Sequence, residues 1–443
     1  MSYSAGHGLP FEHASKLGHL NVIQSEWIKS LISDFETNVN EDPGQYDNSI
    51  WNDIKIDDIK PLQHIWAVDG SYAEVSDNKK EVAFVKTALM TIEQNKISSI
   101  DRDYPHPLLL QEIMTDSALF HATVFPLKNI RSEKGNLYDT VRNVIYDSMR
   151  IDEEGEYFET LKWLSYKKWT DEKPNSPNFQ CPHCQKEVKE GLPFDSDKAR
   201  CPFCGNDVYL TDMLGFHLDM NEENAPLTVA SSYMKVMELL MLFTVIRIHW
   251  NNVDRSLISE TLYIKDGPLS LRGQYVKLVP LIREFLQHAF DGGRPIHILG
   301  CEKSGTFFDY LERVGRYVSN NNGLPKIAVL NHGFIRDEIN RTHKQAYAYG
   351  FRTNWGEKAL VVLDRNTQFV LNMTTGNYYP DDGFPQQKDM IGLDRIIATL
   401  PSLVSRRYAG ALYPIELVNG IASMSYYPSS RILKNFVDAM ISQ

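Results

Sequence analysis

Three carboxylates lie where the chain could use them for chemistry. Asp69 and Asp266 begin the sequences Asp-Gly-Ser at 69–71 and Asp-Gly-Pro at 266–268, each directly after an apolar run that predicts a strand. A carboxylate at the C-terminal end of a strand points into the crevice where α/β sheets bind ligands, and the glycine lets the backbone turn tightly there. Aspartates are also common in ordinary turns, which is the alternative interpretation of each step taken alone.

The third carboxylate is Glu238, within the very apolar segment 236–241. Burying a carboxylate is costly unless it is paired or bound to a metal. One glutamate on a helix and two aspartates at strand ends can hold two Mg²⁺ or Mn²⁺ ions about 4 Å apart, and these hard cations prefer oxygen ligands. Glu260, six residues before Asp266, is the rival third acid, but its neighbours are polar.

Two further side chains could meet a phosphate. Lys303 follows the predicted strand 296–299, and a lysine at a strand end is well placed for that role; the alternative is a surface lysine. Tyr413, which precedes Pro414, could offer its phenol to a phosphate or to an attacking water.

Four of the five cysteines form two Cys-x-x-Cys pairs, Cys181 with Cys184 and Cys201 with Cys204, with 16 residues between the pairs. Each pair supplies two thiolates from one tight turn, and this spacing predicts a tetrahedral zinc site. Because cysteine fills all four positions, we expect a structural Zn²⁺ with no open position for a substrate. His183 lies inside the first pair and is expected to face solvent.

These residues must be positioned by an α/β fold, because strand-like and helical segments alternate along the chain. Strands are predicted at 65–68, 82–92, 121–126, 261–265, 296–299, 327–330 and within 346–378, and helices at 20–35, 137–149, 157–169, 229–249, 271–290, 306–318, 391–404 and 430–440. We divide the chain into an N-terminal helical extension, 1–60, a main domain formed by 61–170 and 206–443, and an inserted zinc ribbon, 171–205.

The composition narrows the class of protein. A formal net charge of −11 argues against a surface that coats DNA, although it leaves room for a local basic groove or for a partner that holds the DNA. An odd cysteine beside metal-type spacing suits a reducing compartment. The N-terminus has no signal-peptide pattern, and the most apolar stretch, 239–246, is too short to span a bilayer. We therefore expect a cytoplasmic protein with no membrane contact.

Taken in order, the motifs resemble the NurA nuclease family. The resemblance rests on the buried helix with Glu238 and on four segments, WAVDGSYAEV (66–75), YIKDGPLSLRGQ (263–274), ILGCEKSG (298–305) and ALYPIELVNGIA (411–422). It spans about residues 60–430 apart from the ribbon. Each motif is short, and their order and spacing carry the resemblance.

The resemblance implies a ribonuclease-H-like mixed sheet flanked by helices. It also implies a Mn²⁺-dependent DNA exonuclease, typically of 5′-to-3′ polarity with some single-strand endonuclease activity. Members of the family dimerise and dock on a HerA-type hexameric ATPase, in DNA-end resection or in defence against phage.

Carried over by position, Asp69, Glu238 and Asp266 match the family's metal-binding acids, and Tyr413 matches its C-terminal tyrosine. A histidine that usually follows this tyrosine is replaced by Ile421, with Asn419 nearby. One ligand role is then vacant or passes to Asn419.

We therefore expect in-line hydrolysis of a phosphodiester, with Mn²⁺ or Mg²⁺ held by the three acids and Lys303 and Tyr413 acting on the phosphate or the water. The alternative is a degenerate nuclease that serves as a DNA-binding or regulatory subunit of the ATPase complex. A preference for RNA is a third reading, although no residue identifies a reader of the 2′-hydroxyl.

Overall fold

The computed structural model describes residues 25–33, 48–76, 80–99, 117–130, 135–152, 154–221, 225–319, 323–340, 350–405, 410–424 and 429–441. The chain divides into two units, Met1–Asp47 and Asn48–Gln443. The described part of the first unit holds one helix, α2 (Glu26–Ser33), within the predicted range 20–35. Trp27 and Ile32 on this helix are exposed.

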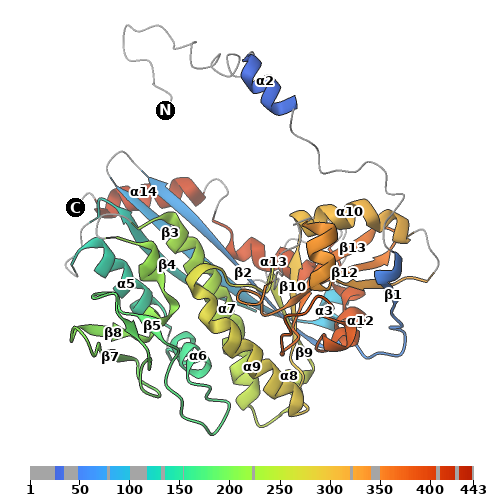
Figure 1. Ribbon diagram of the computed structural model, residues 1–443, viewed down its shortest axis with the longest axis horizontal. Coiled ribbons are helices and arrows are strands. Elements are labelled where there is room, and N and C mark those ends of the chain that lie inside the picture. Colours follow the sequence, from blue (N-terminus) through green and yellow to red (C-terminus); the bar gives the residue numbers. More distant parts are fainter. Residues whose placement is uncertain are drawn as a thin grey trace. The chain divides into compact units, whose positions relative to one another are not determined.

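The second unit is built on one mixed sheet of nine strands (Figure 1). Their order across the sheet is β1 (Trp51–Asp53), β11 (Lys326–Val329), β12 (Glu357–Asp364), β13 (Thr367–Met373), β10 (His297–Glu302), β9 (Thr261–Asp266), β2 (His64–Ser76), β3 (Glu81–Glu93) and β4 (Ala118–Lys128). β9 runs parallel to both of its neighbours, β2 and β10, and every other pairing is antiparallel. The predicted α/β class with a mixed sheet is confirmed.

Helices cover the sheet and form two hydrophobic cores with it. The helices of this unit are α3 (Gln94–Ser99), α5 (Leu137–Ser148), α6 (Glu156–Ser165), α7 (Leu227–Asn251), α8 (Ser256–Ser259), α9 (Leu278–Asp291), α10 (Thr306–Ser319), α11 (His332–Phe334), α12 (Leu393–Leu403), α13 (Tyr413–Ala422) and α14 (Ser429–Ile441). One core holds α5, α6, α7 and α9, and the other holds α12 and α13. Strand β2 alternates between them, since Ala67 belongs to the second core and Val68 to the first.

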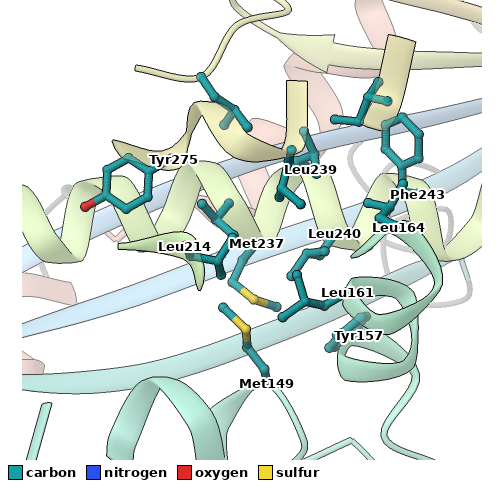
Figure 2. Close-up of a cluster of buried hydrophobic side chains, with 14 of the residues drawn as sticks. Met149, Tyr157, Leu161, Leu164, Leu214, Met237, Leu239, Leu240, Phe243 and Tyr275 are labelled. Atoms are coloured by element: carbon teal, nitrogen blue, oxygen red, sulfur yellow. The ribbon is translucent and has the colours of Figure 1, made fainter. Parts of the chain in front are cut away.

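Helix α7 is the centre of the first core. It packs on both β2 and β3, and Figure 1 shows it lying across these strands. By length and composition alone this helix could cross a membrane. However, 83% of its most apolar 18-residue stretch is buried inside the fold, and a buried core helix has the same length and composition. Figure 2 shows Met237 and Leu240 of this helix meeting Met149 and Leu161 from the α5–α6 side.

Two of the differences from the predictions lie beside the candidate site. Strand β2 does not stop at 69–71, because its antiparallel pairing with β3 runs on to Ser76 opposite Glu81. Helix α13 was not predicted, because the segment 413–422 contains a proline and a glycine. Pro414 lies in the first turn of that helix, where its missing N–H costs nothing.

Candidate metal and catalytic site

The four cysteines lie in two hairpins whose turns have the same backbone geometry. The hairpins are β5–β6 (Phe179–Gln180 with Glu187–Val188) and β7–β8 (Lys198–Arg200 with Asp207–Tyr209). The Cys181 N–H donates to the Lys186 carbonyl and the Cys201 N–H to the Asn206 carbonyl, both at 2.9 Å. Four residues after each of these cysteines the backbone takes a positive φ, so both turns present their two sulfurs in the same way.

The sulfurs of the two turns meet in one cluster. Cys181 Sγ lies 3.8 Å from Cys204 Sγ, and Cys184 Sγ lies 3.8 Å from Cys201 Sγ. All four sulfurs lie within 4.8 Å of one another. A zinc ion bound at about 2.3 Å to each corner of a tetrahedron requires sulfurs about 3.8 Å apart, whereas a disulfide requires about 2.05 Å. The predicted set of four thiolate ligands is therefore assembled, with no position left for a substrate.

The ribbon is part of the main core. Its residues Phe179, Leu192 and Val208 belong to the same hydrophobic core as α7. Arg142 on α5 forms a buried two-pronged ion pair with Asp212, just after the second hairpin, with N–O distances of 2.7 and 2.8 Å. The second hairpin ends at Tyr209, beyond the expected limit of 205.

Ion pairs connect the loop between the two hairpins to α6 and to the residues that follow this helix. Lys162 of α6 lies 2.9 Å from both Asp195 and Asp197, and Lys168 lies 2.6 Å from Asp195. His183 is exposed, as expected, and contacts Arg142 and the Asp207 carbonyl rather than joining the sulfur cluster. The ribbon is thus held by apolar burial and by ion pairs at once.

The carboxylates converge elsewhere, in a pocket of about 460 Å³ at the C-terminal ends of β9 and β10. Its lining includes Asp69, Glu238, Asp266 and Lys303, four of the five residues singled out for catalysis. The pocket forms because β9 ends at Asp266 while β2 continues beside it. This is the strand-end crevice that parallel α/β sheets offer to ligands.

Asp69 and Asp266 lie level with each other on neighbouring parallel strands. Val68 pairs with Lys265, so the next residue on each strand is one of the two aspartates. Asp69 is 5% exposed; it accepts a hydrogen bond from the Gly70 N–H at 2.8 Å and one from Asn419 Nδ2 at 2.7 Å. Burial, followed by the charges of Asp266 and Glu238, raises the pKa of Asp69 to about 7.

Gly70 has a different role from the one expected. It makes no turn, because β2 passes straight through it. A Cβ at this position would lie 2.6 Å from Met234 Cγ and 2.8 Å from Glu238 Oε1. Glycine is required here for the close approach of α7 to β2, which brings Glu238 to the pocket. Gly267, by contrast, has a φ of +81° and does make the expected turn.

Replacing Gly70 with alanine should therefore disturb Glu238 directly. We expect the free energy of unfolding to fall by about 1–3 kcal/mol, the usual cost of overpacking, and a crystal structure to show a displaced Glu238 carboxylate. Gly267→Ala is the matched control, because nothing lies within 4 Å of its Cβ and its cost is backbone strain of about 1–2 kcal/mol. An unmoved Glu238 in the Gly70 variant would contradict this role.

Glu238 is bound by a lysine that the sequence reasoning missed. Lys265 Nζ lies 2.6 Å from Glu238 Oε2 and donates to the Asp266 carbonyl at 2.8 Å. Both side chains of the ion pair are more than nine-tenths buried. The feature that could have revealed Lys265 is its place in an otherwise apolar strand, where a lysine requires an acidic partner.

Lys303 binds the third acid. Its Nζ lies 2.9 Å from Asp266 Oδ2, so a predicted phosphate ligand and a predicted metal ligand touch. Asp266 Oδ1 is buried and has no hydrogen-bond partner among the described residues. The neighbouring Glu302 also lines the pocket, but it is held from behind by Lys358 and Asn372.

Two of the earlier candidates are not brought to the pocket. Tyr413 is 1% exposed at the start of α13, and its ring fills the second core instead of reaching the pocket lining. Glu260, the rival acid, precedes β9 at the opposite end of that strand and is paired with Arg395 at 3.0 and 2.8 Å.

On α13, Asn419 reaches Asp69, while Ile421 packs against the second core. The residue expected to inherit the missing histidine's place is thus the one in contact with a carboxylate.

No family model and no curated protein matches the chain. Among solved structures, it is similar to the NurA nuclease from Sulfolobus solfataricus (TM-score 0.36, 11% identity, 97% of each chain). It is also similar to a second NurA structure (0.34, 11%, 96% of this chain and 98% of that one) and to NurA bound to dAMP and manganese (0.30, 12%, 96% and 95%).

These structures bear the name of the family that the sequence motifs resemble.

Proposed function

We propose that the protein is a metal-dependent DNA nuclease that hydrolyses phosphodiesters in the pocket between β2, β9 and α7. The observation that carries this proposal is the convergence of Asp69, Glu238 and Asp266 with Lys265 and Lys303 in one pocket. Carboxylates are the ligands that Mg²⁺ and Mn²⁺ prefer, and lysines neutralise phosphate. A pocket that combines both suits a phosphate ester bound beside a divalent cation.

The acids fit such a cation on two counts. Burial, followed by repulsion from Asp266 and Glu238, raises the pKa of Asp69, and a cation would relieve this repulsion. The Oδ1 atom of Asp266 is buried without a described partner and is free to act as a ligand. These three acids would hold Mn²⁺ or Mg²⁺. When bound, a cation of this kind lowers the pKa of a water and stabilises the charge on the departing oxygen.

The chain's own residues supply the remaining functions. Lys303, whose side chain is 34% exposed at the pocket, can neutralise a non-bridging phosphate oxygen while it holds Asp266. Asn419 fixes the orientation of the Asp69 carboxylate through its amide. Gly70 keeps the backbone clear so that Glu238 can enter.

Cleavage of end-labelled single- and double-stranded DNA with Mn²⁺, Mg²⁺ or EDTA tests the proposal. Loss of a residue that only supports a metal ligand costs about 10–100-fold, so loss of a ligand in Asp266→Ala should cost more than about 100-fold. Glu260→Ala is the matched control, because it removes an acid at the other end of the same strand. Equal activity of Asp266→Ala and wild type would refute the assignment.

The polarity of cleavage, the oligomeric state and the partner are proposed from the resemblance of the sequence motifs to the NurA family. We propose 5′-to-3′ exonuclease activity with single-strand endonuclease activity, a cytoplasmic homodimer or higher oligomer, and a HerA-like hexameric ATPase as partner in DNA-end processing or phage defence. A net charge of −11 predicts weak, salt-sensitive binding of DNA by the chain alone. Degradation of long duplex should therefore rise sharply when the cognate ATPase and ATP are added at physiological salt, and no rise would count against the partner.

A second candidate function is a DNA-binding or regulatory subunit without catalysis. The observation that favours it is that each acid already has a protein partner: Lys265 pairs with Glu238, Lys303 with Asp266, and Asn419, in the region where the family has a histidine, with Asp69. Metal-independent DNA binding with no cleavage, even with the ATPase present, would support this candidate over the nuclease.

A further inference from the structure

Cations of the chain itself already pair with two of the three acids proposed as metal ligands, Asp69, Glu238 and Asp266. Lys265 Nζ lies 2.6 Å from Glu238 and Lys303 Nζ lies 2.9 Å from Asp266, whereas the described donors to Asp69 are both neutral, the Gly70 N–H and the Asn419 amide. Within the cluster of Asp69, Glu238, Asp266, Lys265 and Lys303, three carboxylates and two ammonium groups leave one net negative charge. A single divalent cation reverses that charge, and a second would add two more positive charges to an already cationic pocket.

The two lysines are not equally free to leave. Lys303 is one-third exposed and can swing toward a substrate. Lys265, on β9, is 7% exposed; it forms an ion pair with Glu238 of α7 and donates a hydrogen bond to the Asp266 carbonyl. Removing it from this position would leave Glu238 as a buried carboxylate without its partner, which is strongly unfavourable.

We propose that the ammonium group of Lys265 takes the place of a second divalent cation, so that the pocket binds one cation, at Asp69 and Asp266. This inference rests on the proposed nuclease function and departs from the two-cation reaction expected from the sequence. Glu238 then acts as the anchor for Lys265.

An ammonium group has three N–H donors, and the structure describes one hydrogen bond from Lys265, to the Asp266 carbonyl, beside its ion pair with Glu238. A further N–H is available for a phosphate oxygen. Lys265 would thus hold a fixed positive charge beside the substrate, while activation of the water is left to the single divalent cation.

The number of bound Mn²⁺ ions tests the proposal. The full chain, with the ribbon loaded with zinc, is titrated with Mn²⁺ and followed by calorimetry and electron paramagnetic resonance. We expect one Mn²⁺ per wild-type chain. Lys265→Met should bind two, and their spectrum should show magnetic coupling, because ions in a two-metal site lie about 4 Å apart.

Two variants serve as controls. Lys265→Arg keeps the charge and should bind one ion. Lys235→Met removes a positive charge from the same pocket lining, from α7, the helix that carries Glu238. The structure describes no ion pair for this lysine, and the variant should also bind one ion. If Lys265→Met fails to fold, Lys265→Gln replaces it, since its amide can still donate a hydrogen bond to Glu238.

Two Mn²⁺ ions on the wild type would overturn the proposal, and so would one ion on the folded, neutral Lys265 variants. Cleavage is measured separately on the same samples. If the wild type cleaves DNA and binds two Mn²⁺ ions, the nuclease function is supported, and the proposal that Lys265 replaces a cation is refuted. One ion on the wild type and two on Lys265→Met, with no cleavage under any condition, would uphold the charge replacement and refute the nuclease.

Discussion

Cys181→Ser is expected to lose the ribbon's metal and to lower the thermal unfolding midpoint of the whole second unit by about 10 °C or more. Structural zinc contributes directly to folding free energy, and replacing one thiolate opens the tetrahedron. The effect should not stay local, because Cys181 is fully buried in the core that contains α7. Differential scanning calorimetry, together with zinc determination by mass spectrometry, measures both losses.

Phe203→Ala is the matched control for that variant. Phe203 lies inside the second Cys-x-x-Cys turn, but its ring is 54% exposed and it offers no ligand. It should keep its zinc and its unfolding midpoint within about 1 °C. A separate low-temperature transition for the ribbon in Cys181→Ser, with the main transition unmoved, would instead indicate an independent module.

Packing explains why the ribbon's ligands were predictable and its place in the fold was not. The spacing of the two Cys-x-x-Cys turns is enough to predict a metal site, and the four sulfurs do lie together in the structure. That Leu192 and Val208 would join the core of α7 depends on contacts far apart in the sequence. A composition rich in charge and proline around 171–205 predicts an insertion but does not reveal what the insertion covers.

The two glycines beside the pocket also show that tertiary contacts decide a role that the local sequence does not reveal. The identical Asp-Gly pattern at 69–70 and 266–267 predicted two turns, and only Gly267 makes one. At Gly70 the determining contact is with Met234 and Glu238, on a helix more than 160 residues further along the chain. The carboxylates were found because strand ends and buried acids can be recognised locally, whereas Lys265 and Asn419 become site residues only through tertiary contact.

Asp69→Asn should abolish the proposed cleavage and, in buffer free of Mn²⁺ and Mg²⁺, stabilise the protein at pH 8. The pKa of Asp69 is about 7 in the folded protein against an ordinary value of 3.8, so between these two values the folded state holds a proton that the unfolded chain has already released. Wild-type stability therefore falls as pH rises from about 4 to 7, and the loss is complete above pH 7. Asparagine avoids this loss and can still accept the hydrogen bond from Asn419.

Urea unfolding at a series of pH values measures the difference. We expect Asp69→Asn to exceed wild type by on the order of 2–4 kcal/mol at pH 8, with the gap shrinking steadily toward pH 4. Addition of Mn²⁺ at pH 8 should stabilise wild type and leave the variant unchanged. Asp364→Asn, at an exposed aspartate at the end of β12, should show neither effect. A variant less stable than wild type at pH 8 would mean that the Asp69 carboxylate is stabilised in the fold, and that the pocket carries no electrostatic strain for a cation to relieve.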